Sequence, residues 1–237
     1  MKEAGFSGAE VVPMPRYDIP GHKTVDWGSE RWKQMSLFML EMAEKYDFTI
    51  DFTMSPCWPL ALPDITDPAD PKQGAQVELN GAFLDGITRW TPYRGQVPVS
   101  REAVENAASV KAYPHLTAVT CAKYLDKEHR LLDYASARSF KLGEEVIPSR
   151  RSPLFWEIDF VPEDEGEYVL FGWWEHSSGE RTCGNLQLDH YGKYGADALI
   201  RYWEEELLPS YGTHFSKVTA MFIYSLEYRT HLDWTWG

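Results

Sequence analysis

Residues 48–53 read Phe-Thr-Ile-Asp-Phe-Thr, and this alternation of apolar and polar side chains predicts a β-strand with one buried face. The segment before it has a different period. Apolar side chains recur there at intervals of three and four, which predicts a helix whose apolar stripe packs into the core. The stripe consists of Trp32, Met35, Phe38, Met39, Met42 and Ala43. Ser29 is expected to cap the helix, with Glu30 in its first turn.

A second strand is predicted ahead of the helix. Residues 7–14 contain Ala9, Val11 and Val12 and run into Pro13, while Gly5 is expected to end a short helix at residues 1–4. Two strands separated by a helix of this length are normally parallel, with a right-handed crossover. Residues 1–75 are therefore interpreted as a βαβ unit, the repeat of doubly wound sheets and (β/α)8 barrels.

The middle of the chain has a different pattern. Strands are predicted at residues 77–83, 116–125, 154–161 and 168–174, with turn-rich polar segments between them. Residues 76–176 are accordingly expected to form a β-rich insertion.

The α/β pattern resumes in residues 177–237. A helix is predicted at 194–208 and a buried strand at 218–224, which leads directly into Ser-Leu-Glu-Tyr at 225–228. Three candidate parallel strands are fewer than the eight of a closed barrel. We therefore expect α/β architecture: an incomplete (β/α)8 TIM-type barrel with an insertion, a piece of a longer enzyme that alone exposes apolar strand edges and is inactive.

Composition excludes some classes of protein. The formal net charge of -13 disfavours a nucleic-acid partner, because that affinity comes chiefly from Lys and Arg on phosphates. No apolar run approaches the roughly 20 residues that cross a bilayer, and the first residues lack the apolar segment of a signal peptide.

Cys57, Cys121 and Cys183 are too widely spaced to predict a zinc site or a disulfide framework. The aromatic content of 14% suits either a large core or a carbohydrate cleft.

Short segments along the chain carry a family resemblance. They are residues 3–10 (Glu-Ala-Gly-Phe-Ser-Gly-Ala-Glu), 28–32 (Gly-Ser-Glu-Arg-Trp), Trp58-Pro59 with 63–66 (Pro-Asp-Ile-Thr), 170–172 (Leu-Phe-Gly) with Ser178-Gly179, Leu188-Asp189, and 225–228 with 233–235 (Asp-Trp-Thr). In this order they resemble glycoside hydrolase family 106, the α-L-rhamnosidases. The chain departs from the family pattern at Cys57, at residues 60–62 (Leu-Ala-Leu) and at Tyr224, where the family usually carries Gly, a glycine-rich loop and Asp.

The resemblance implies a glycosidase that removes terminal α-L-rhamnose or a related deoxyhexose from polysaccharide. It also implies calcium, with ligands that the sequence does not identify, no organic cofactor, and a secreted or periplasmic location. Glu227 matches the family's Ser-x-Glu element, which implies a catalytic role as general acid. The alternative for Glu227 is a rim residue paired with Arg229.

Glycoside hydrolysis needs a pair of carboxyl groups, and barrel enzymes place such groups at the carboxyl ends of strands. Glu10, the segment 51–63 and Glu227 have such positions. Glu10 is a candidate for sugar binding or for the partner carboxylate, or else forms an ion pair. Trp58, Trp174 and Trp234 are candidates for stacking on the substrate's sugar ring, with core packing as the alternative for each.

Two other functions remain open. The first is a non-catalytic carbohydrate-binding protein or an inactive fragment of such an enzyme, which Tyr224 favours and Glu227 disfavours. The second is a structural α/β protein of another family. His176, His190, His214 and His231 show no metal-ligand spacing, so a zinc site is not expected.

Overall fold

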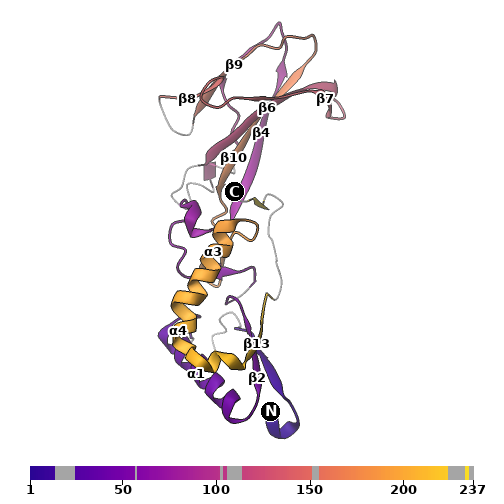
Figure 1. The fold of residues 1–237 in the computed structure, drawn as a ribbon. Coiled ribbons are helices and arrows are strands. Elements are labelled where there is room, and N and C mark those ends of the chain that lie inside the picture. Colours follow the sequence, from indigo (N-terminus) through magenta and orange to yellow (C-terminus); the bar gives the residue numbers. More distant parts are fainter. Residues whose placement is uncertain are drawn as a thin grey trace, which may run out of the picture. The chain divides into compact units, whose positions relative to one another are not determined.

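A computed structural model describes residues 1–13, 25–56, 58–101, 104–105, 114–150, 155–223 and 233–234. The chain divides into two compact units (Figure 1). Unit 1 comprises Met1–Gln76 and Gly179–Gly237, and unit 2 comprises Val77–Ser178.

A three-stranded parallel sheet lies at the centre of unit 1. Its strands are β1 (Gly8–Val11), β2 (Thr49–Thr53) and β13 (Val218–Phe222), in the order β1-β2-β13. The alternation in residues 48–53 is confirmed, because Ile50 and Phe52 are buried in the core of unit 1. The prediction that residues 218–224 form a buried strand is wrong as to burial, since Thr219 and Ala220 are exposed.

Helix α1 (Glu30–Lys45) connects β1 to β2, and the predicted cap is confirmed: the Ser29 hydroxyl accepts a hydrogen bond from the backbone N–H of Trp32 at 3.2 Å. The predicted apolar stripe is partly wrong, because Met35 and Phe38 are 43% and 58% exposed. Apolar residues extend around more of this helix than one face can bury. The buried face of α1 consists of the side chains of Ser36, Leu40 and Ala43.

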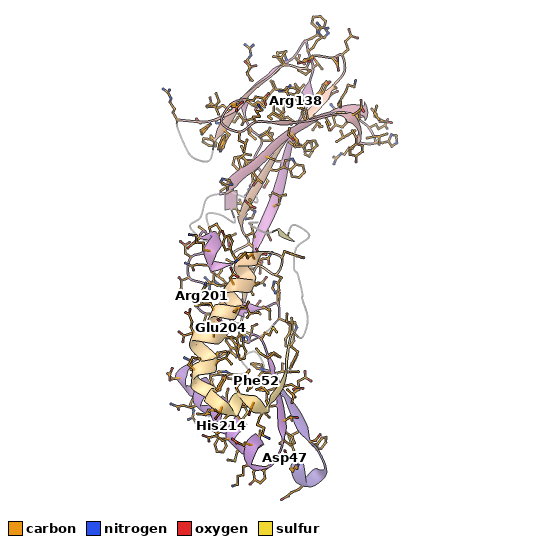
Figure 2. The ribbon with its side chains drawn as sticks, in the orientation of Figure 1. Asp47, Phe52, Arg138, Arg201, Glu204 and His214 are labelled. Carbon is orange, nitrogen blue, oxygen red and sulfur yellow. The ribbon has the colours of Figure 1, made fainter. Side chains whose placement is uncertain are left out.

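A continuous helical run leads into β13. It consists of α3 (Lys193–Tyr202), the π-helical turn η3 (Trp203–Leu207), α4 (Leu208–Tyr211) and the 3₁₀ segment η4 (Gly212–Lys217). Figure 1 places α4 beside α1, and Figure 2 shows the Phe52 side chain of β2 toward this run. The Phe52 and Tyr211 rings are stacked with centroids 6.1 Å apart, so the run covers one face of the parallel sheet.

Smaller elements complete unit 1. A second sheet has the order β11-β12-β3 and is antiparallel. These elements are β3 (Ala61–Leu62), β11 (Arg181–Thr182), β12 (Asn185–Gln187), and the 3₁₀ turns η1 (Lys2–Ala4) and η2 (Pro71–Gln73). The predicted glycine cap at the start of the chain is confirmed, because Gly5 has φ 87° and ends η1. Strand β14 (Asp233–Trp234) is also described.

Unit 2 is built from two antiparallel sheets. One contains β4 (Val77–Ile87), β10 (Tyr168–Ser177), β6 (His115–Asp126) and β7 (Leu131–Phe140) in the order β4-β10-β6-β7. The other contains β5 (Tyr93–Gln96), β9 (Trp156–Phe160) and β8 (Val146–Pro148) in the order β5-β9-β8. Side chains of both sheets pack into one core, where the Phe160 ring meets Phe140 and Tyr168 edge-on. The four strands predicted in this segment are confirmed within a few residues at their ends.

The prediction of an incomplete (β/α)8 TIM-type barrel is wrong. The described strands form several small sheets. The strand pairs β1–β2 and β2–β13 are parallel, whereas β4, β10, β6 and β7 pair antiparallel, as do the strands of the β11-β12-β3 and β5-β9-β8 sheets. Antiparallel strands are joined by turns and need no crossover helix, so they add nothing to a barrel wall. One βαβ unit does not determine how the rest of a chain is arranged.

Candidate functional site

The carboxyl ends of three strands lie at one edge of the parallel sheet. Glu10 of β1 is paired with Asp51 of β2, and Phe222 of β13 is paired with Thr53 of β2. The backbone N–H of Met54 donates to the Phe222 carbonyl at 3.0 Å, which continues the pairing beyond β2. In open parallel sheets, ligands bind beyond this edge because the loops after the strands converge there. We call this edge of the β1-β2-β13 sheet the carboxyl edge.

Two carboxylates stand beside each other on the sheet face opposite the helices. Glu10 is exposed, Asp51 is half-buried, and their neighbours along the strands, Val11 and Phe52, belong to the core on the other face. Asp51 Oδ1 accepts a hydrogen bond from the Thr219 hydroxyl at 2.5 Å. Both carboxylates are therefore presented on a polar sheet face, with Asp51 held in place from β13.

Two buried hydroxyl groups mark the end of β2. Ser55 Oγ accepts a hydrogen bond from the backbone N–H of Ala61 at 3.3 Å. The Thr53 hydroxyl is buried, and within the described residues it has no hydrogen-bond partner. An unpaired buried hydroxyl costs about 1–3 kcal/mol, so Thr53 is a polar group that a ligand or water at this edge can satisfy.

The loop after β2 is held from two sides. Trp58 is half-buried and precedes Pro59 through a cis peptide bond. The next residue, Leu60, donates its backbone N–H to Nε2 of His190 at 3.2 Å. The Trp203 indole N–H donates to the Met54 carbonyl at 2.9 Å, which ties the start of the loop to η3. These contacts fix the segment that carries Trp58 beside the carboxyl edge.

The His190 imidazole must remain neutral to accept the hydrogen bond from the Leu60 N–H. Burial lowers the pKa of this imidazole, and the nearby Asp189 carboxylate opposes the shift. Because the folded-state pKa lies below the unfolded value, the unfolded state takes up the proton first as the pH falls. We therefore expect the free energy of unfolding to fall as the pH drops below about 6.5, the usual pKa of histidine. Urea unfolding at a series of pH values measures this slope.

The matched control is His190→Gln, whose side-chain carbonyl can still accept from Leu60 but does not titrate. Its unfolding free energy should depend less steeply on pH than that of the wild type between about pH 6.5 and 5. Identical slopes for the two proteins would show that His190 does not carry this pH dependence.

Backbone contacts fix the start of α3 close to His190. Asp189 Oδ1 accepts hydrogen bonds from the backbone N–H groups of Tyr191 and Gly192, both at 3.0 Å, and the Asp189 N–H donates to the Gly74 carbonyl at 2.8 Å. A Cβ atom on Gly195 would lie 1.8 Å from the Asp189 carbonyl oxygen. Helix α3 therefore packs backbone to backbone against the segment that carries His190.

A pocket of about 430 Å³ opens elsewhere on unit 1. Its lining consists of Trp27, Gly28, Ser29, Pro63, Asp64, Arg201, Tyr202, Glu205 and Glu206. The Trp27 and Tyr202 rings stack with centroids 5.2 Å apart. Figure 2 shows Arg201 and Glu204 on the helical run, whose π-helical turn brings Glu205 and Glu206 to this pocket. Such turns are frequent at functional sites.

The carboxyl groups of this pocket differ in environment. Partial burial raises the pKa of Asp64, the carboxylates of Glu206 and Glu205 add to the effect, and Arg201 opposes it. Lys33 forms ion pairs with Glu206 at 3.1 Å and with Glu30 at 3.4 Å. Asp64 is nevertheless an exposed residue, and it lines the pocket together with Glu205 and Glu206.

Unit 2 contains a separate buried polar cluster. The Asn80 side-chain amide donates to Nε2 of His176 at 2.6 Å, and His176 Nδ1 donates to the Ser177 carbonyl at 2.8 Å. Glu78 Oε2 lies 3.8 Å from the same Nε2, and all these side chains are buried. The cluster ties β4 to β10 and accounts for His176 as a structural side chain.

The structure places the residues singled out from the sequence in different environments. Glu10 lies at the carboxyl edge of unit 1, and Trp58 is half-buried in the loop that follows β2. Trp174 lies in the core of unit 2 with no exposed surface, which leaves its ring no face for a sugar. Trp234 belongs to β14, but its side chain lies outside the described part of the structure, as does all of Glu227.

Three residues that contribute to these sites were not proposed individually as site residues from the sequence. They are Asp51, His190 and Asp64. Asp51 interrupts an apolar strand and points to a polar sheet face, whereas Asp64 follows a proline in a long loop, and such loops are often functional. His190 follows Asp189 just before a helix, but nothing in the sequence pairs it with Leu60.

Possible metal ligands and the cysteines form no further candidate site among the described residues. Within the described residues, no group of three or more His, Cys, Asp or Glu side chains is arranged to hold a metal ion. Cys121 is buried with a free thiol, and Cys183 takes part in a disulfide that the cysteine spacing did not predict.

No helix in the described part of the chain is long and apolar enough to span a membrane.

Comparison with protein-family models, curated proteins and solved structures finds no match to this chain.

Proposed function

We propose that the protein is a glycoside hydrolase that removes terminal α-L-rhamnose or a related deoxyhexose from polysaccharide. The observation that carries the proposal is the parallel order β1-β2-β13, which brings Glu10, the loop with Trp58 and the end of β13 to one edge. Strand β13 ends at Phe222, five residues before Glu227 in the sequence. Loops after parallel strands are where such folds bind ligands. The proposal also rests on the family resemblance of segment 225–228.

The reaction requires two carboxyl roles. Glu227 acts as the general acid that protonates the glycosidic oxygen as the bond to the sugar breaks. Glu10 is the partner that activates water or attacks the sugar carbon directly. Asp51 is less suited to that role, because the Thr219 hydroxyl already occupies Oδ1. Trp58 offers a ring beside the edge on which the sugar's C–H face stacks.

An assay with an aryl α-L-rhamnoside tests the function. Incubation of the full-length enzyme, of which this chain is proposed to be a piece, with 4-nitrophenyl α-L-rhamnoside should release nitrophenol, because the substrate presents the terminal sugar with a leaving group that is easily detected. Heat-denatured protein is the control for spontaneous hydrolysis. Binding of L-rhamnose without release of nitrophenol would favour the non-catalytic alternative. Absence of both would remove the rhamnosidase assignment.

The proposed substrate fits a protein that works outside the cytoplasm, since polysaccharides of this kind are encountered there. We therefore propose a secreted or periplasmic location, which fractionation of the source cells would establish.

A further inference from the structure

Three aromatic side chains gather on the outward face of the β4-β10-β6-β7 sheet. On β10, Phe171 and Trp173 alternate with Leu170 and Trp174, which face the core. Phe171 is paired across the strands with Phe83 of β4. We call Phe83, Phe171 and Trp173 the aromatic surface of unit 2.

The Trp173 ring lies along the sheet. It is paired with Gly81 on one side and with Ala118 on the other, so small residues flank it on both neighbouring strands. A Cβ atom on Gly81 would lie only 2.8 Å from Cζ3 and 3.1 Å from Cε3 of the Trp173 ring. The ring thus occupies the space that a larger residue would fill, and Trp173 is half-buried.

The neighbouring rings extend this surface. The planes of Phe171 and Trp173 differ by 20°, with centroids 5.7 Å apart. Residues two apart on a strand are separated by roughly 6.8 Å, so the two rings can stack on each other along β10. The Phe83 centroid is 6.2 Å from that of Phe171, and Phe83 is 51% exposed. The result is an apolar cluster in which Phe83 is exposed and the stacked rings of Phe171 and Trp173 are half-buried.

Polar groups hold and border the rings. The Trp173 indole N–H donates to the Thr120 hydroxyl at 2.9 Å, which fixes the ring orientation before any ligand binds. The Arg130 guanidinium lies 5.9 Å from the Phe83 centroid. The Tyr124 hydroxyl donates to Asp85 Oδ1 at 2.6 Å. Hydrogen-bond donors and acceptors therefore lie next to this apolar cluster.

We propose that the aromatic surface of unit 2 is a polysaccharide-binding site, separate from the carboxyl edge of unit 1. A sugar ring has a C–H face that stacks on an aromatic ring and a rim of hydroxyl groups that both donate and accept hydrogen bonds. The preset Trp173 ring and the bordering Arg130 and Asp85 match both features. The choice of polysaccharide as the ligand rests on the proposed function. The arrangement of the rings in the aromatic surface is observed independently of that function.

Affinity gel electrophoresis of the full chain tests the site, with soluble rhamnogalacturonan, xylan or dextran cast into the gel. The wild type should be retarded by rhamnogalacturonan. Trp173→Ala and Phe83→Ala should each weaken this affinity about tenfold, the effect of losing about 1.4 kcal/mol of binding free energy. Phe83 is more than half exposed, so its variant is expected to fold even if Trp173→Ala does not. Trp90→Ala is the matched control, because Trp90 is 79% exposed in the same unit and lies outside the aromatic surface.

The outcomes separate the two proposals. Retention of the wild type without release of nitrophenol supports this site and removes the hydrolase, whereas release of nitrophenol without retention in any of the three gels does the reverse. Undiminished retention of both Phe83→Ala and a folded Trp173→Ala would overturn the site. So would a dimer in sedimentation that these substitutions dissociate, because the surface would then bind a second copy of the chain.

Discussion

Glu227→Gln should abolish turnover of polysaccharide while the protein still binds it. Glutamine keeps the size and hydrogen-bonding capacity of the side chain but cannot give a proton to the departing oxygen. General acid catalysis typically contributes about 10²–10⁴-fold to the rate, so the loss on a substrate with a poor leaving group should fall in that range. The measurement is the release of reducing sugar from rhamnogalacturonan, with binding of L-rhamnose as the binding readout.

The leaving group distinguishes the role of Glu227. Nitrophenol departs with little need for a proton, so a general acid is expected to matter less for 4-nitrophenyl α-L-rhamnoside than for polysaccharide. Equal losses on both substrates would instead assign Glu227 to the base or nucleophile role. Undiminished turnover of both would remove it from the mechanism. Glu10→Gln is the companion variant, and as the partner carboxylate it should lose both activities.

Trp174→Ala should lower the free energy of unfolding of unit 2 by about 3–5 kcal/mol, the usual cost of removing a fully buried Trp side chain. Trp174 has no exposed surface, and its indole N–H donates to the Pro98 carbonyl at 2.7 Å. The variant therefore leaves both a cavity and a carbonyl without this donor. Urea unfolding monitored by circular dichroism measures the loss.

The control for Trp174 is Trp90→Ala, which should change the unfolding free energy by no more than about 0.5 kcal/mol, as surface substitutions usually do. Trp174→Phe should lose less than Trp174→Ala because it refills much of the space. If Trp174→Ala instead kept its stability and lost retention by polysaccharide, Trp174 would return to the sugar-binding role expected from its position near a strand end.

Local elements could be predicted from the sequence because their signals are local. The Ser29 cap depends on residues within one helical turn, and the alternation in residues 48–53 reports one buried sheet face. The assembly of strands depends on partners far apart in the chain. For example, β10 pairs with both β4 and β6. The pattern of residues within β10 does not predict which strands are its neighbours or in which direction they run.

The candidate site was predictable only in part for the same reason. Glu10 could be assigned to a strand end from its neighbours Val11 and Val12. Its pairing with Asp51 required the register of β1 against β2, and the role of His190 required its contact with Leu60, 130 residues away in the chain. Trp174 and Trp173 are adjacent in the sequence, yet one is core and the other lies on the outward face. Sequence alone did not show which of the two faces outward.

The direct main-chain contact between Gly195 and Asp189 limits how unit 1 can change shape. No side chain lies between these segments to rotate aside, so α3 cannot advance toward residue 189 by even a fraction of a turn without collision. Any displacement of the loop bearing Trp58 that is transmitted through His190 would have to carry the beginning of α3 along as a rigid body. The segment that carries His190 is therefore set in advance by the backbone, with adjustment left to side-chain rotation.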